Sequence, residues 1–231
     1  MTLLAETWAY FLSDQERFIR LLTQHLVLSL AALSIALAIC LPLGIWIAHR
    51  KRAAQPVINS FNALRVLPSL VILFLALPFL GLGFWPSLVA LTVLACPPIL
   101  INTYAGIRSV DPATREAAVG IGMSNRQTLG RIELPLAYPV ILTGVRIAAV
   151  EVIASATLAA FIAGGGLGEY VMRGFALNEA SIMLVGAVAV ALLALGAELI
   201  FVGLQQLPRL RGGWVAQDLS LIHISEPTRP Y

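Results

Sequence analysis

The chain has 231 residues, of which 59% are hydrophobic and only 12% are charged. A soluble globular domain carries about 25% charged residues, so the excess apolar surface here must face lipid rather than water. The net charge is +3, and the basic residues stand between long apolar runs, a pattern that orients a membrane protein and excludes a nucleic-acid-binding surface.

The chain contains five apolar runs long enough to cross a bilayer as helices. We expect an all-α, polytopic transmembrane bundle, because a soluble core of this size could not be covered by so few polar residues. Prolines interrupt the second and third runs, so these two helices should lie inside the bundle, beside a cavity or a partner. The runs are residues 26–48, 66–82, 85–107, 139–163 and 182–207.

The two ends of the chain are expected to lie outside this bundle. Residues 1–23 place Trp8, Phe11 and Phe18 at roughly helical spacing, which favours an interfacial helix, and they lack the basic start of a cleavable signal peptide. Residues 219–231 resemble a translated sequencing-library adapter, and we interpret them as an artefact tail. The transmembrane domain is therefore predicted to cover residues 24–211.

Charge in the loops predicts the orientation. Basic residues gather between the first and second runs and between the third and fourth, whereas the other loops are neutral or acidic. The positive-inside rule then places the N-terminus outside and the C-terminus in the cytoplasm, and an odd number of spans agrees. The basic residues are Arg50, Lys51, Arg52 and Arg65 in the first group and Arg108, Arg115, Arg126, Arg131 and Arg146 in the second.

The segment 111–135, on the predicted cytoplasmic side, has the pattern of two short helices that meet at a turn. Asp111 suits a helix N-cap, and Pro112 suits the first helical position. Gly122 fits a left-handed helix end, and Pro135 is expected to stop the second helix. Such a compact protrusion could dock in a groove of another protein.

The same segment resembles the coupling loop of binding-protein-dependent ABC importer permeases. Its pattern is Glu-Ala-Ala, three residues, Gly, nine residues, Ile, one residue and Leu-Pro, and every position is filled. The matching residues are Glu116, Ala117, Ala118, Gly122, Ile132, Leu134 and Pro135. Glu-Ala-Ala alone occurs in any alanine-rich helix, but seven positions in register between two spans are specific.

The resemblance implies a function and a set of partners. It implies a MetI-like permease fold in a bacterial inner membrane, with the coupling loop docked on a cytoplasmic ABC ATPase present in two copies. An extracytoplasmic substrate-binding protein and a second permease copy or homologue would complete the transporter. The chain itself is not expected to hydrolyse ATP, because its only lysine, Lys51, does not follow a glycine-rich phosphate-binding loop. No cofactor or metal is expected.

Two strings resemble a subgroup of these permeases. Residues 164–175 contain Gly164-Gly-Gly-Leu-Gly-Glu-Tyr170, whose composition alone indicates a flexible outer turn. This string and Arg65-Val-Leu-Pro-Ser69 resemble the permeases for glycine betaine, choline, carnitine and related osmoprotectants. A permease for methionine or another amino acid remains the alternative, because methionine-type permeases share much of the loop.

Polar residues inside the apolar runs are the candidates for the translocation pathway. Intramembrane carboxylates are costly and usually face a cavity or a partner. Glu151 is the main candidate, with Ser155 one turn further and Asn102 in the proline-broken third run, although structural pairing of Glu151 is the alternative. Glu198 lies nearer a helix end and is expected to pair or to reach the interface. Cys40 and Cys96 are interpreted as buried, inert thiols.

Two other classes of membrane protein compete with an ABC permease. An ion-driven secondary transporter usually shows inverted repeats, and five apolar runs do not divide into two halves. A membrane scaffold would have no reason to carry the complete coupling pattern.

Overall fold

The computed structural model describes residues 2–211, with side chains left out at 51 and 207–211. The predicted tail 219–231 therefore lies outside the described residues. Within 2–211 the fold is entirely helical, as predicted. Its elements are α1 (Leu3–Ser13), α2 (Gln15–Ala48), α3 (Lys51–Leu64), α4 (Ser69–Leu80), α5 (Phe84–Arg108), α6 (Pro112–Gly120), α7 (Asn125–Thr128), the π-helical turn η1 (Leu129–Glu133), α8 (Leu134–Ser155), the 3-10 helix η2 (Ala156–Ile162), α9 (Gly168–Leu177) and α10 (Ala180–Arg211).

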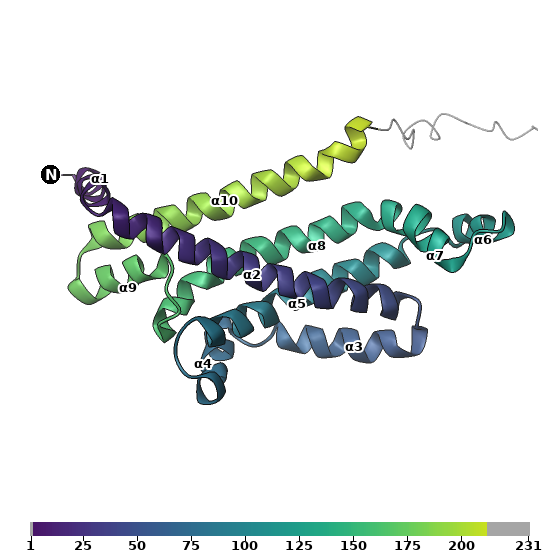
Figure 1. Ribbon diagram of the computed structural model, residues 1–231, viewed down its shortest axis with the longest axis horizontal. Helices are drawn as coiled ribbons and strands as arrows, with labels where there is room; N and C mark the ends of the chain where they lie inside the picture. The colour runs from purple at the N-terminus through teal and green to yellow at the C-terminus, as the bar shows by residue number, and fades with distance from the viewer. Residues whose placement is uncertain (1, 212–231) are drawn as a thin grey trace, which may run out of the picture.

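Helix α5 forms the centre of the bundle and packs mainly against α2 and α8 (Figure 1). Small residues allow this close packing, because a Cβ at Gly44 would lie 2.8 Å from Thr103 and one at Gly106 would lie 3.0 Å from the Ala137 carbonyl oxygen. In a bilayer the hydrophobic effect does not drive helices together, so their association depends on van der Waals contacts between closely spaced backbones. The bundle has two distinct ends: α6 and α7 lie at one, the α6 end, and α1 and α9 lie at the other, the α9 end (Figure 1).

Four described helices are long and apolar enough to span a membrane, and the bent pair α3–α4 would make a fifth span. The structure corrects the expected second run, 66–82, because the chain bends by 94° between α3 and α4. Pro68 disfavours helical geometry at the residue before it and lies at the start of α4, so the bend falls at 65–68. Arg65 consequently caps the end of α3 instead of lying in a loop.

Two other helices begin earlier than the apolar runs suggested. Helix α2 already starts at Gln15, directly after a break at Asp14, so residues 15–23 continue into the first long helix. The helical path of the fourth run is continuous from Asn125 to Ile162. Polar residues extend both helices beyond their apolar runs, which is why hydropathy alone placed their starts too late.

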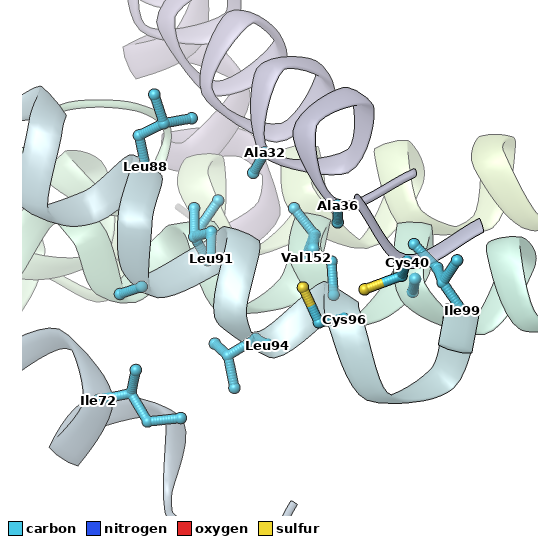
Figure 2. Close-up of a cluster of buried hydrophobic side chains, with 14 of the residues drawn as sticks. Ala32, Ala36, Cys40, Ile72, Leu88, Leu91, Leu94, Cys96, Ile99 and Val152 are labelled. Atoms are coloured by element: carbon cyan, nitrogen blue, oxygen red, sulfur yellow. The ribbon is translucent and has the colours of Figure 1, made fainter. Parts of the chain in front are cut away.

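The largest apolar core lies where α2, α5 and α8 meet. Figure 2 shows Ala36 and Cys40 of α2 facing Cys96 of α5, with Val152 of α8 beside them. Both cysteines are free and buried, as the sequence predicted. Alanine and cysteine are small, so their side chains bring the three helices together without leaving a large gap.

Gly144→Ala should destabilise the bundle, because its Cβ would lie 2.5 Å from Cβ of Asn102 and 2.6 Å from the Pro98 carbonyl oxygen. Gly196→Ala in α10 is the matched control, since its Cβ meets nothing within 4 Å and it gains the same helix propensity. We expect Gly144→Ala to be less stable than Gly196→Ala by about 1–3 kcal/mol in thermal unfolding in detergent. Equal unfolding temperatures would contradict the close packing of α5 on α8.

Candidate functional site

Helix α6 begins as the sequence predicted. The Asp111 side chain accepts a hydrogen bond of 3.0 Å from the backbone N–H of Ala113, and Pro112 follows in the first turn. The aspartate satisfies a donor that the helix leaves free, and proline needs no acceptor there. This local chemistry fixes where α6 starts and projects it from the α6 end of the bundle (Figure 1).

The turn after α6 is built on Gly122. Its φ of +86° lies in the left-handed region that favours glycine. The N–H of Gly122 donates to Val119 O and that of Met123 to Ala118 O, at 2.9 and 3.1 Å, which is the Schellman arrangement of a helix end. A capping box between Ser124 and Gln127 then starts α7. The predicted turn is therefore present.

Pro135 does not end the second helix, contrary to the prediction. The chain runs from α7 through the π-helical turn η1 into α8, and Pro135 lies in the first turn of α8. In a π-helical turn the backbone bonds reach five residues back, so a proline that follows it disrupts fewer regular helical bonds. The coupling pattern thus ends inside a continuous helix that leads into the membrane-spanning core.

The seven residues of the coupling pattern divide between two environments. Glu116, Ala117, Gly122 and Pro135 are exposed, whereas Ala118 is buried and Ile132 and Leu134 are half-buried. Two apolar side chains near the end of α6 and at its C-cap are also exposed. Val119 is 57% exposed and Ile121 is 80% exposed.

Three charged or titratable residues meet behind α6, a contact that the sequence did not predict. Glu133, in η1, places Oε2 2.8 Å from Nε2 of His49 and Oε1 2.7 Å from Nε of Arg115. Arg115 also donates to the Ile107 carbonyl at the end of α5. The sequence held one signal that could have pointed to this group: Glu133 is a charged residue at the unspecified position of the pattern between Ile132 and Leu134, directly before an apolar helix.

Glu151 and Ser155 share a small polar cavity between α3, α4, α5 and α8. Its volume is about 120 Å³, and Arg65 and Ser69 line it too. Glu151 forms no ion pair within 4.0 Å among the described side chains, although Arg65 is close enough to act on it through its charge. Asn102 does not line this cavity. Its side chain lies where α5 packs against Gly144, and its Nδ2 donates to Pro98 O at 2.8 Å.

Glu198 pairs with Arg146, which is one of the two outcomes that the sequence predicted for it. Its Oε1 lies 3.2 Å from a guanidinium nitrogen of Arg146, which also donates to Gln205. Gln205 in turn donates to the Thr143 hydroxyl at 3.0 Å. This polar group fastens α10 to α8 and leaves Glu198 outside the Glu151 cavity.

At the α9 end, the predicted outer turn leads into a helix. After left-handed residues at Ala163, Gly165 and Gly166, α9 begins at Gly168. The Tyr170 hydroxyl donates to Oδ2 of Asp14 at 3.2 Å and thereby joins α9 to the α1–α2 junction. Burial, followed by the charge and hydrogen bond of Asp14, raises the pKa of Tyr170 to about 12.

Comparison with known proteins identifies the family. Residues 40–209 match the binding-protein-dependent transport system inner membrane component family. The chain belongs to this family. It is 42% identical over 175 residues to the carnitine transport permease protein OpuCB of Listeria monocytogenes, covering 76% of this chain and 80% of that protein. It is 41% identical over 172 residues to the choline transport system permease protein OpuBB of Bacillus subtilis, covering 74% and 79%.

Solved structures confirm the fold. The chain is similar to an inward-facing structure of the MetNI methionine ABC transporter, with a TM-score of 0.75 and 19% identity over 84% of this chain and 97% of that chain. A crystal structure of an amino acid ABC transporter with histidines gives a TM-score of 0.65 and 21% identity, over 88% and 98%. The chain is thus a multi-pass membrane permease of the bacterial inner membrane, in a family that works with an ATPase and a substrate-binding protein.

The raised pKa of Tyr170 predicts a pH dependence of stability. The folded protein favours the neutral phenol, so its contribution is complete below about pH 10, the usual tyrosine range, and is lost as the pH rises to about 12. Thermal unfolding in detergent should therefore show wild type losing its advantage over Tyr170→Phe across this window. Tyr138→Phe, at the α6 end, controls for the number of tyrosines, and a parallel loss in all three proteins would refute the assignment.

Proposed function

We propose that this permease carries a small osmoprotectant such as glycine betaine, choline or carnitine across the inner membrane. The observation that carries the proposal is the identity of about 40% to relatives named for carnitine and choline transport, over about three quarters of the chain. A methionine permease is less well supported, because the MetNI transporter shares the fold at only 19% identity. The import direction follows from dependence on an external binding protein.

The α6 end faces the cytoplasm in this proposal. Basic residues gather there, which supports the orientation by the positive-inside rule. The α9 end carries acidic residues alongside its few arginines, among them Asp14 and Glu169. The N-terminus is then outside and the C-terminus inside. The basic residues at the α6 end are Arg50, Arg52, Arg108, Arg115, Arg126 and Arg131.

ATP is hydrolysed by a separate subunit that binds α6. The exposed apolar side chains of Val119 and Ile121 stand at the cytoplasmic end, where water rather than lipid would otherwise meet them, and this supports a protein partner. Ala117 permits close approach, and Glu116 offers a carboxylate for polar contacts on the same exposed surface. Two ATPases act on two permease copies, or on a permease and a homologue, and one binding protein delivers the substrate.

The polar cavity at Glu151 is the proposed substrate station within the membrane. A carboxylate attracts a quaternary ammonium group, and the Arg65 guanidinium on the same cavity suits the carboxylate that glycine betaine and carnitine carry. Ser155 adds a hydroxyl. Asn102 is not favoured for this role, because it lies outside the cavity.

Reconstituted uptake tests the function. Proteoliposomes that contain the permease, its ATPase and its binding protein should take up radiolabelled choline, carnitine or glycine betaine only with ATP and the binding protein. Glu116→Lys should lower uptake roughly a hundredfold by placing the wrong charge on the docking surface, and Gly122→Pro should abolish it by distorting the turn. Both variants should remain in the membrane.

Glu116→Asp, which keeps the charge, is the matched control and should retain most of the uptake. If the proteoliposomes take up methionine and none of the osmoprotectants, the protein is a methionine permease and the proposed substrate class is wrong. Uptake driven by an ion gradient without ATP would show a secondary transporter instead.

Glu151→Gln should lower uptake of choline about tenfold while complex assembly and binding-protein docking remain normal, because the cavity loses its only carboxylate. Glu198→Gln is the control, since this carboxylate also lies in a spanning helix but pairs with Arg146 away from the cavity. Initial uptake rates at saturating binding protein measure the effect. Equal rates for Glu151→Gln and wild type would exclude Glu151 from the pathway.

A further inference from the structure

Glu133 is a carboxylate buried at the point where α6, α7 and α8 come together. Its side chain is only 3% exposed, yet it contacts two basic groups: His49 Nε2 at 2.8 Å and Arg115 Nε at 2.7 Å. The second contact is an ion pair whose geometry is not that of a hydrogen bond. Buried charges are costly unless they are compensated from more than one side, and Glu133 is compensated from two.

The two partners of Glu133 each hold the end of a long helix. His49 caps the end of α2, and its Nδ1 lies 2.9 Å from the Ile45 carbonyl oxygen. The Arg115 guanidinium donates to Ile107 O in the last turn of α5. Positive groups are favourable at helix C-termini. One carboxylate at the start of α8 therefore links α6 to the ends of both α2 and α5.

Few other contacts join α6 to α2 and α5. It packs mainly on α7 and η1, which begin the continuous helix that runs on into α8, and not on α2 or α5. Ala118 is the residue of α6 that is buried. A push on α6 therefore reaches α2 and α5 most directly through Arg115 and Glu133.

The backbone around Glu133 is also unusual. Residues Leu129–Glu133 form a π-helical turn, a feature that is rare and frequent at functional sites. One extra residue in a turn changes the direction of the side chains that follow by about 100°. Apolar residues of similar volume in place of Glu133, Arg115 and His49 together would leave no charge to bury, and such replacements of buried ion pairs are often neutral or stabilising. Stability alone therefore does not account for a glutamate.

We propose that Glu133, Arg115 and His49 are positioning residues that make α6 and the cytoplasmic ends of α2, α5 and α8 move as one rigid unit. This inference rests on the proposed function, in which α6 receives the movement of the ATPase. The contacts of Glu133 with Arg115 and His49 transmit that movement to three spanning helices at once. Without them α6 could follow the ATPase while the spanning helices lag behind, so ATP would be hydrolysed with less transport.

The test is the number of substrate molecules taken up per ATP hydrolysed by the reconstituted full transporter. Glu133→Gln, Arg115→Gln and the double variant are compared with wild type, using radiolabelled choline or carnitine. Co-purified ATPase measures assembly. Glu198→Gln, which breaks the 3.2 Å pair between Glu198 of α10 and Arg146 of α8, is the matched control for loss of a carboxylate.

We expect each single variant to take up about tenfold less substrate per ATP, with the same amount of co-purified ATPase. The double variant should be no worse than either single one, because the two residues act as a unit. Glu198→Gln should keep the wild-type ratio. A wild-type ratio in Glu133→Gln, a loss of uptake that only follows loss of bound ATPase, or multiplying losses in the double variant would each overturn the proposal. Absence of ATP-driven uptake in wild type would overturn the proposed function, and this inference with it.

Discussion

The close approach of α5 to α2 and α8 is the constraint on which the rest of the structure depends. In a bilayer, apolar side chains gain nothing by leaving lipid for protein, so helices associate through tight packing of small residues. Gly44, Gly106 and Gly144 each bring a backbone to within contact distance of a neighbouring helix. Helix α5 is held along its length by this packing. Hydrogen bonds hold its two ends as well, because Ile107 O accepts from Arg115 at the α6 end and Gly83 N–H donates to Ile162 O at the other.

Polar chemistry lies where the helices are irregular. Glu133 belongs to a π-helical turn, the Glu151 cavity opens beside the bend between α3 and α4, and Tyr170 follows a loop with left-handed residues. A regular helix satisfies its own backbone, so irregular backbone inside a membrane protein is tolerated only next to polar partners or a cavity. The three sites therefore follow from the same rule, at the α6 end, the middle and the α9 end of the bundle.

Sequence reasoning succeeded where the signal is local. The long apolar runs, the N-cap at Asp111 and the left-handed turn at Gly122 depend on residues a few positions apart. It failed where distant segments meet, because Glu133 contacts His49 from 84 residues away and Tyr170 contacts Asp14 from 156 residues away. Pro135 was misread as a helix stop because the π-helical turn before it has no sequence signature. Arg65 was assigned to a loop because hydropathy does not show that a polar helix and a short apolar helix meet at a bend.

Helix α8 connects the two ends of the proposed mechanism. Glu133 stands at its start and Glu151 lies eighteen residues further, about 27 Å along a helix. The helix is continuous between them, with Pro139 in its second turn. If α8 pivots about its start at the α6 end, a tilt of about 10° displaces Glu151 by about 5 Å, which exceeds the length of an ion pair. Arg65, across the cavity, belongs to a different helix. A rotation of this size at the coupling loop is therefore enough to bring the two charges together or to separate them around a dipolar substrate.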